Sequence, residues 1–218
     1  MRGTIYDATE DKIPAQSASV WTVVLEPAYI KKGMEETIAE GLAPILGLDK
    51  ETIVEKAQNK NSYFTYLKRR VETSVKEEVV AFLDENDITA GVRLIDDYKR
   101  YYPYGTVAST VLGCIGDDNS GLAGLELQYD TELRGTAGRM ISAKNSIGTD
   151  MPFQYEQLVG AEDGNNLVLT IDETVQSIGE KQLERGIDQY VVNNGAGGIG
   201  MNVNTGAIIA IGSKGAFD

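Results

Sequence analysis

The stretch "DNSGLAGLELQYDTELRGTAGR", residues Asp118 to Arg139, decides the fold of this chain. Its glycines predict tight turns, because glycine adopts backbone conformations that other residues avoid. A phosphate-binding loop is excluded, since "GLAGLE" lacks the lysine and hydroxyl residue that a P-loop carries after its second glycine. We therefore interpret Gly121 and Gly124 as residues that permit turns which a side chain would block.

The preceding stretch, "RYYPYGTVASTVLGCIG" (Arg100–Gly116), is rich in tyrosine. A nucleic-acid site is disfavoured here, because two aspartates lie just upstream whereas such sites lie in a basic field. We predict a packed structural corner that presents Arg100 to its neighbours, with Pro103 and Gly105 at the turn. A surface for a protein partner and a direct glycan contact are the alternatives.

The amino-acid composition disfavours or excludes several classes of function. The 218 residues carry 20 Lys and Arg against 33 Asp and Glu, a net charge of -13, which repels nucleic acid and anionic membrane surfaces. The chain has no histidine, so Ser-His-Asp triads and histidine zinc sites are excluded. "GAGGIG" (Gly195–Gly200) follows a predicted helix, whereas a dinucleotide fingerprint follows a strand. We expect no cofactor, no metal and no nucleic-acid partner.

The first half of the chain predicts strands around a helical lobe. "SVWTVVLE" (Ser19–Glu26) alternates as a strand does. Residues 31–90 are interpreted as helical and charged, with Asp49 as an N-cap. Within that range, Ser74 and Glu77 have the spacing of a capping box.

The last third predicts a helix followed by a hairpin. Asp172 is placed to cap a helix whose apolar stripe indicates core packing; the stripe is Val175, Ile178, Leu183, Ile187 and Val191. Two apolar runs around "NTG" (Asn204–Gly206) predict a β-hairpin. Because the hairpin is apolar on both faces, we expect it to belong to a larger sheet and the chain to stop partway through a domain. The unpaired edge then predicts one of three outcomes: the last strand is disordered, it pairs with another copy in a crystal, or it promotes a homodimer in solution.

Three motifs in order resemble those of one protein family. "RGTIYD" (Arg2–Asp7) and the two stretches above resemble the successive motifs of the pedestal, or dimerisation, domain of class B penicillin-binding proteins. "DGNNLVLTIDETVQ" and "MNVNTGAIIAI" resemble the start of that family's transpeptidase domain. The resemblance implies an α+β fold: an elongated pedestal over residues 1–160 with a helical lobe at about 31–90, then a linker, helix and hairpin over 161–218.

The resemblance also implies a function. The family's members hold a D,D-transpeptidase that cross-links peptidoglycan outside the cell membrane, where an N-terminal transmembrane anchor normally precedes "RGTIYD". The implied partners are the chain's own transpeptidase domain, division or glycosyltransferase membrane proteins, and a second copy. "GDDNSGLAGLE" is closer to the division and sporulation branch than to the elongation branch. A freestanding scaffold or adhesion protein with a pedestal-like fold is the alternative.

Matching residue by residue gives the structural positions. The resemblance places Arg2, Arg100 and Glu126 near the joint between pedestal and catalytic domain, with Asp7 as a fourth member. The remaining motif positions are Gly3, Pro103, Gly105, Gly121, Gly124, Gly135 and Gly138.

Catalytic residues are not expected in this chain. A penicillin-binding transpeptidase requires Ser-x-x-Lys, then Ser-x-Asn and Lys-Thr-Gly. No serine here has a lysine three residues later, and the other two motifs are missing as well. We therefore predict that the chain itself is not acylated by penicillin.

Overall fold

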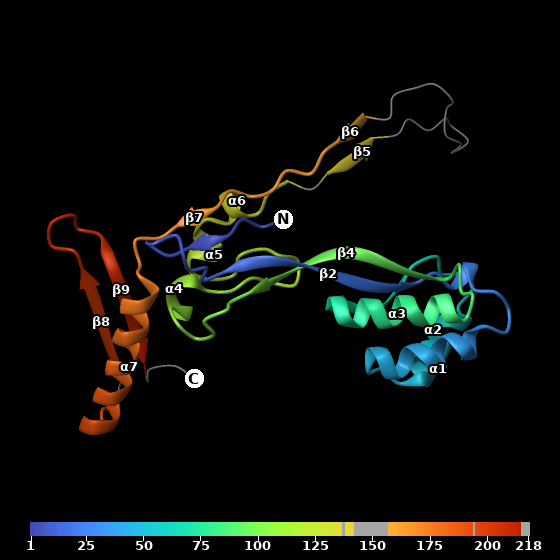
Figure 1. Ribbon diagram of the computed structural model, residues 1–218, viewed down its shortest axis with the longest axis horizontal. Coiled ribbons are helices and arrows are strands. Elements are labelled where there is room, and N and C mark those ends of the chain that lie inside the picture. The colour runs from blue at the N-terminus through green and yellow to red at the C-terminus, as the bar shows by residue number, and fades with distance from the viewer. Residues whose placement is uncertain (137, 142–156, 194, 215–218) are drawn as a thin grey trace. The chain divides into compact units, whose positions relative to one another are not determined.

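The computed structural model describes residues 1–136, 138–141, 157–193 and 195–214. The backbone divides into two compact units: a split unit, Met1–Ser17 with Arg100–Asp218, and an inserted unit, Ala18–Lys99. Helices and strands occur in both (Figure 1), so the expected α+β class is confirmed. A boundary at residue 160 stays a prediction.

The inserted unit contains a three-stranded sheet of order β3-β2-β4. The strands are β2 (Gln16–Leu25), β3 (Thr65–Val71) and β4 (Val92–Tyr101). β2 runs antiparallel to β3, with Trp21 opposite Val71. The expected strand at 19–26 is confirmed; its β-branched residues suit the half-buried surface of a pleated sheet.

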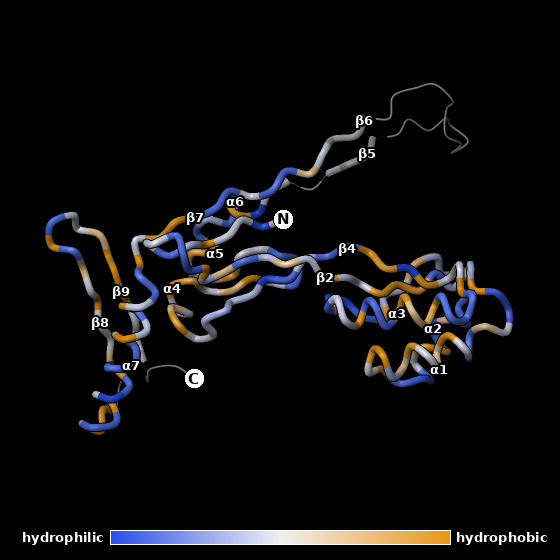
Figure 2. The backbone as a smooth tube through the Cα atoms, in the orientation of Figure 1, coloured by the Kyte–Doolittle hydropathy of each residue, from blue (hydrophilic) through white to orange (hydrophobic). Residues whose placement is uncertain are grey.

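Three helices accompany this sheet: α1 (Glu35–Leu46), α2 (Lys50–Gln58) and α3 (Thr73–Glu85), with a 3-10 turn, η1 (Pro27–Tyr29), before them. Apolar residues recur along these helices between polar ones (Figure 2) and supply a core with β2 and β3. At Gly41 in α1, an added Cβ would lie 2.0 Å from the Phe82 ring of α3. The missing side chain therefore lets the two helices approach closely.

Two expectations for residues 31–90 need correction. The range is not wholly helical, because it contains β3. Ser74 is the second residue of α3 and Glu72 occupies the cap position, so the capping box is wrong. The expected position of Asp49 at the N-cap of α2 is confirmed, and its side chain makes no capping hydrogen bond there.

The split unit is built from short elements. β1 (Ile5–Tyr6) pairs in parallel with β7 (Leu167–Val168), and β5 (Arg139–Ile141) pairs with the antiparallel β6 (Gln157–Val159). Three short helices lie between them in the chain: α4 (Ser109–Leu112), α5 (Gly124–Gln128) and α6 (Asp130–Leu133). Their shared core consists of Ile5, Ala15, Ala108, Leu112 and Leu133.

The split unit ends with α7 (Glu173–Tyr190) and the antiparallel hairpin of β8 (Ala196–Met201) and β9 (Ile208–Lys214). The expected cap is confirmed, since the Asp172 carboxylate accepts hydrogen bonds from two amides of the first turn of α7. The expected hairpin is confirmed too.

The apolar stripe expected to pack α7 into a core is wrong at three of its five positions. Val175 is 39% exposed, Ile178 is 55% exposed, and Val191 is 75% exposed and lies just past the end of the helix. The buried residues of α7 are instead Gln176 and Glu180. The helix therefore uses polar side chains on the face that it buries.

Candidate functional site

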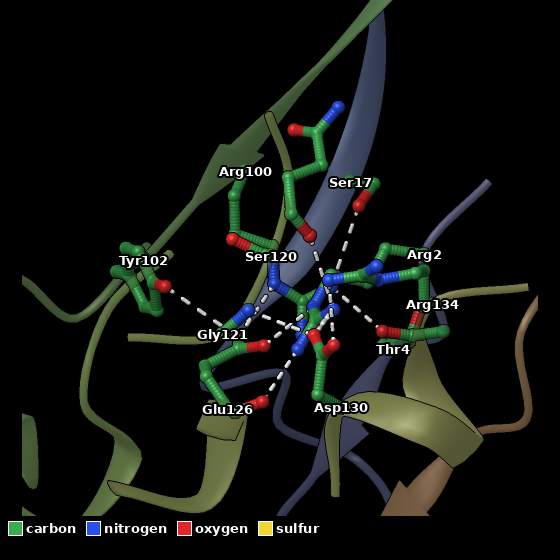
Figure 3. A network of polar contacts seen from close by, with 12 residues as sticks. Arg2, Thr4, Ser17, Arg100, Tyr102, Ser120, Gly121, Glu126, Asp130 and Arg134 are labelled. Atoms are coloured by element: carbon green, nitrogen blue, oxygen red, sulfur yellow. Dashed lines mark hydrogen bonds and ion pairs between the residues drawn. The ribbon is translucent and has the colours of Figure 1, made fainter. Parts of the chain in front are cut away.

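A buried ion-pair network joins the three sequence motifs of the split unit (Figure 3). At its centre is Glu126 in the first turn of α5, whose side chain is fully buried. Oε2 of Glu126 accepts a hydrogen bond from Nε of Arg2 at 2.6 Å, and Oε1 accepts one from Nε of Arg100 at 2.8 Å. One carboxylate thus holds two arginines, one on each oxygen.

Both guanidinium groups also bind backbone carbonyls. Nη2 of Arg2 donates to the Glu126 carbonyl at 2.7 Å, and its Nη1 donates to the Asn119 carbonyl at 3.2 Å. Nη1 of Arg100 donates to the Gly3 carbonyl at 2.6 Å. These bonds are directional, so they fix the backbone of the first motif against that of the third.

A second carboxylate, Asp130, balances the charge of the network. Its Oδ1 accepts from Nη1 of Arg2 and from the Gly121 amide, each at 2.7 Å. Burial by itself raises the pKa of Asp130, but the hydrogen bonds from Arg2 and Gly121 outweigh burial and leave the pKa below its usual value. Two buried arginines are therefore matched by two carboxylates, as buried charges require.

Asp130 lies within the third motif, but it is the member of the network that the residue-by-residue match left out. It lies four residues after Glu126 in the sequence, a spacing that brings two side chains to one side of a helix. In the structure it begins the next helix, α6. The spacing was thus the only sequence signal for it.

The tyrosine-rich corner borders this network. The hydroxyl of Tyr102 lies 3.5 Å from Oε1 of Glu126, and its ring packs against the core of the split unit. Burial, together with the negative charge of Glu126, raises the pKa of Tyr102 to about 12. Pro103 and Gly105, which follow in the chain, are exposed.

The motif glycines lie where backbones approach closely. An added Cβ at Gly121 would lie 2.0 Å from the Glu126 carbonyl, and one at Gly3 would lie 1.9 Å from the Asn165 carbonyl. Gly124 and Gly135 have positive φ angles of 59° and 69°. Gly138, the last glycine of the third motif, is exposed.

Asp7 lies outside the network, although the resemblance suggested it as a fourth member. Its Oδ1 accepts from the hydroxyl of Thr9 at 2.7 Å, and its Oδ2 accepts from the amide of Glu173 at 3.4 Å. Burial alone raises the pKa of Asp7, but these hydrogen bonds lower it overall. The first motif thus reaches the N-terminus of α7 through Asp7.

Three further contacts hold α7, and we call them with the Asp7 bond the α7 contact set. Nζ of Lys12 pairs with Glu173 at 2.5 Å. Further along the helix, Oε1 of Glu180 accepts from the amide of Ala108 at 2.8 Å. Gln176 exchanges two hydrogen bonds of 2.8 Å with the backbone of Ile211 in β9. The sequence did not predict Gln176 and Glu180 as buried residues, because the buried face of a helix is normally identified from its apolar residues.

The contacts of this arrangement join backbone segments and helices of the split unit. Within the part of the chain that the structure describes, no group of three or more Cys, Asp or Glu side chains is placed to hold a metal ion. None of the helices described there is long and apolar enough to cross a membrane.

Comparison with known proteins identifies related sequences. The profile of the family described as Penicillin-binding Protein dimerisation domain matches residues 1–169. Stage V sporulation protein D of Bacillus subtilis (strain 168) is 32% identical over 219 residues, which cover 100% of this chain and 32% of that protein. Peptidoglycan D,D-transpeptidase FtsI of Buchnera aphidicola subsp. Schizaphis graminum is 29% identical over 160 residues, covering 73% and 27% of the two chains. The chain thus spans about a third of the length of these relatives.

Solved structures share the fold. Penicillin Binding Protein 2X from Streptococcus thermophilus aligns with a TM-score of 0.72 and 24% identity, covering 98% of this chain and 34% of that one. The penicillin-binding protein PBP2 from Helicobacter pylori, solved as a complex with MreC, aligns with a TM-score of 0.70 and 24% identity, covering 98% and 41%. The expected pedestal fold is confirmed.

Proposed function

Because the chain belongs to the penicillin-binding protein dimerisation domain family, we propose that it is the non-catalytic pedestal region of a class B peptidoglycan transpeptidase. Its role is to position the catalytic domain of the parent protein. The resemblance to class B penicillin-binding proteins that the three motifs suggested is confirmed by this match. A freestanding scaffold has no comparable support.

The observation that carries the proposal is the buried Glu126 with an arginine on each carboxylate oxygen. The three residues belong to the three sequence motifs, and Arg2 lies 124 residues before Glu126 in the chain. An apolar contact allows sliding, whereas two charge-assisted hydrogen bonds fix both distance and direction. The network therefore suits a support that must hold a fixed geometry.

The α7 contact set extends this support toward the segment that resembles the start of the transpeptidase domain. Asp7 and Lys12 hold the first turn of α7, and Ala108 holds its second turn through Glu180. We propose these contacts as the joint, with the arginine network as the part that makes the joint rigid. Movement of the first motif would then be passed directly to α7.

The branch, partners and location form the finer part of the proposal. A septal or sporulation role is supported by the amino-acid sequence of the third motif and by the relatives named Stage V sporulation protein D and FtsI. Docking to division or shape-related membrane proteins has a parallel in the H. pylori PBP2–MreC complex. We place the chain on the outer face of the cell membrane, held there by an anchor in the parent protein.

The test uses the full-length parent carrying Glu126→Ala. We expect fluorescent penicillin to label the variant, because the serine chemistry lies elsewhere, while complementation of a strain lacking the parent fails. The matched control is Glu132→Ala, an exposed glutamate six residues later. Normal wall synthesis by the Glu126 variant at equal protein level would contradict the positioning role.

A further inference from the structure

The inserted unit carries two pairs of exposed aromatic side chains, which we together call the aromatic patch: Tyr29 with Tyr63, and Phe64 with Tyr66. The rings of Tyr29 and Tyr63 have centroids 5.8 Å apart, and those of Phe64 and Tyr66 are 4.9 Å apart, both in edge-to-face contact. Exposed fractions range from 43% to 65%. Single exposed aromatics are ordinary, but exposed rings that pack in pairs favour a binding surface.

Three of the four patch residues, Tyr63, Phe64 and Tyr66, lie in a strongly basic segment of this acidic chain. Residues 56–70, "KAQNKNSYFTYLKRR", contain five cations and no Asp or Glu, while the chain as a whole has a net charge of -13. The Arg69 guanidinium lies 5.5 Å from the centroid of the Tyr66 ring. A positive surface beside open rings suits a ligand that carries both apolar faces and negative charge.

Some of these cations are engaged in the fold, but the surface keeps a positive charge. Lys60 pairs with Glu35 at 2.8 Å, which neutralises one of the five. Lys56 donates to the carbonyl of Tyr66 at 3.0 Å, and Lys68 donates to the carbonyl of Leu46. A carbonyl dipole does not cancel an ammonium charge, so Lys56 and Lys68 still attract anions.

We propose that the aromatic patch binds the glycan strand of peptidoglycan, with its stem-peptide carboxylates facing the basic residues. Sugar rings present C–H groups on one face, which pack on the electron-rich face of an aromatic ring. The carboxylates supply the charge that Lys68 and Arg69 attract. This inference rests on the proposed function, which places the chain beside nascent wall polymer; an acidic protein segment is the competing occupant.

The experiment measures co-sedimentation of the 218-residue chain with purified sacculi, and its affinity for soluble uncrosslinked disaccharide-peptide strands. We expect saturable binding that weakens with salt. Tyr63→Ser combined with Tyr66→Ser should lower the affinity roughly tenfold or more. Both side chains are exposed, so the variant should keep its helical circular dichroism and melting temperature.

Matched control variants distinguish binding by the aromatic patch from non-specific adsorption to the wall polymer. Tyr190→Ser removes a tyrosine that is 73% exposed in the other unit, and Arg93→Gln removes an exposed arginine outside the basic segment; both should bind as the unchanged chain does. Arg69→Gln should weaken binding, as should amidation of the stem-peptide carboxylates. Hydrofluoric acid treatment, which strips phosphodiester polymers from sacculi, should leave binding intact.

Several results would overturn the proposal. They are no binding of the unchanged chain to sacculi or strands, equal loss in the Tyr190 control, and loss of binding after hydrofluoric acid treatment. Failure here would leave the positioning role intact, because that role is measured by penicillin labelling and complementation of Glu126→Ala. Failure of the Glu126 experiment with retained glycan binding would instead remove the positioning role alone.

Discussion

Glu126 shows how one residue can determine the geometry of a whole motif set. Its carboxylate is fully buried between Arg2 and Arg100. Its effect on the free energy of unfolding therefore depends on the unpaired buried charges that its removal would leave. A buried pair is weak evidence for net stability, since desolvation offsets attraction. Removal of one partner, however, leaves buried charges without compensation.

We therefore predict that Glu126→Ala in the 218-residue chain destabilises the split unit by about 3–5 kcal/mol. The melting temperature should fall on the order of 10 °C for a chain of this size. Thermal unfolding followed by circular dichroism measures the change, with Glu132→Ala as the exposed control. An unchanged melting temperature would show that the arginines find other partners.

Acid should weaken the same network through Asp130. Its pKa in the folded chain is lowered from 3.8, so the folded state binds its proton less readily than the unfolded state does. Its contribution to stability is complete above the unfolded pKa and is lost as pH falls through the folded pKa. Urea unfolding between pH 6 and pH 3 should show a loss beginning below roughly pH 4.

Asp130→Asn provides the comparison for that titration. The variant should be less stable at pH 6, because the ion pair with Arg2 is gone, and its stability should fall less steeply in acid. Asp7 and Glu35 also have lowered pKa values, so some acid dependence will remain. Parallel curves for the variant and the unchanged chain would exclude Asp130 as a source of the acid response.

At the scale of elements, the side-chain amide of Gln176 holds α7 where an apolar contact was expected. Its Nε2 donates a hydrogen bond to the Ile211 carbonyl, and its Oε1 accepts one from the Ile211 backbone amide, as a neighbouring strand would. Truncation to Gln176→Ala leaves the Ile211 amide and carbonyl without these partners, at a cost of about 1–3 kcal/mol. Hydrogen exchange should accelerate in α7 and β9, while β2 is unaffected; Gln182→Ala, at an exposed position of the same helix, should change neither.

The elements also show where sequence patterns are informative. The strand over 19–26, the cap at Asp172 and the "NTG" hairpin were predictable, because alternation, capping and turn chemistry are local. β3 was missed, since its alternation of Leu67 and Val71 with exposed residues lies inside a charged stretch. Burial of Gln176 and Glu180 depends on backbone groups far away in the chain, which no local pattern reveals.

The same division applies to the buried network. The residue-by-residue match to the family singled out Arg2, Arg100 and Glu126, and the structure places both arginines on Glu126, while their role at a joint remains a proposal. Asp7 was associated with them by resemblance, yet its carboxylate faces α7. Neither that difference nor the contact of Asp130 with Arg2 could be read from spacing, because both depend on how short helices turn.

At the scale of the whole molecule, the residues that the structure describes form two hydrophobic cores. One lies in the inserted unit around α1 and β2, and the other lies in the split unit around Ile5 and Leu133. Each unit buries its own apolar surface and is expected to open with its own free energy. A destabilising substitution in one core should therefore lower the stability of its own unit and leave that of the other unit nearly unchanged.

This separation predicts a selective response to the network lesion. In Glu126→Ala, native-state hydrogen exchange should speed up for protected amides of β1, α5 and α6, while amides of α1 and β2 within Ala18–Lys99 keep their rates. A matched lesion in the inserted unit, Leu42→Ala, should cost about 2–5 kcal/mol and show the reverse pattern. Uniform acceleration of both units by either substitution would mean that the chain unfolds as one cooperative body, because the cores would then share a single opening reaction.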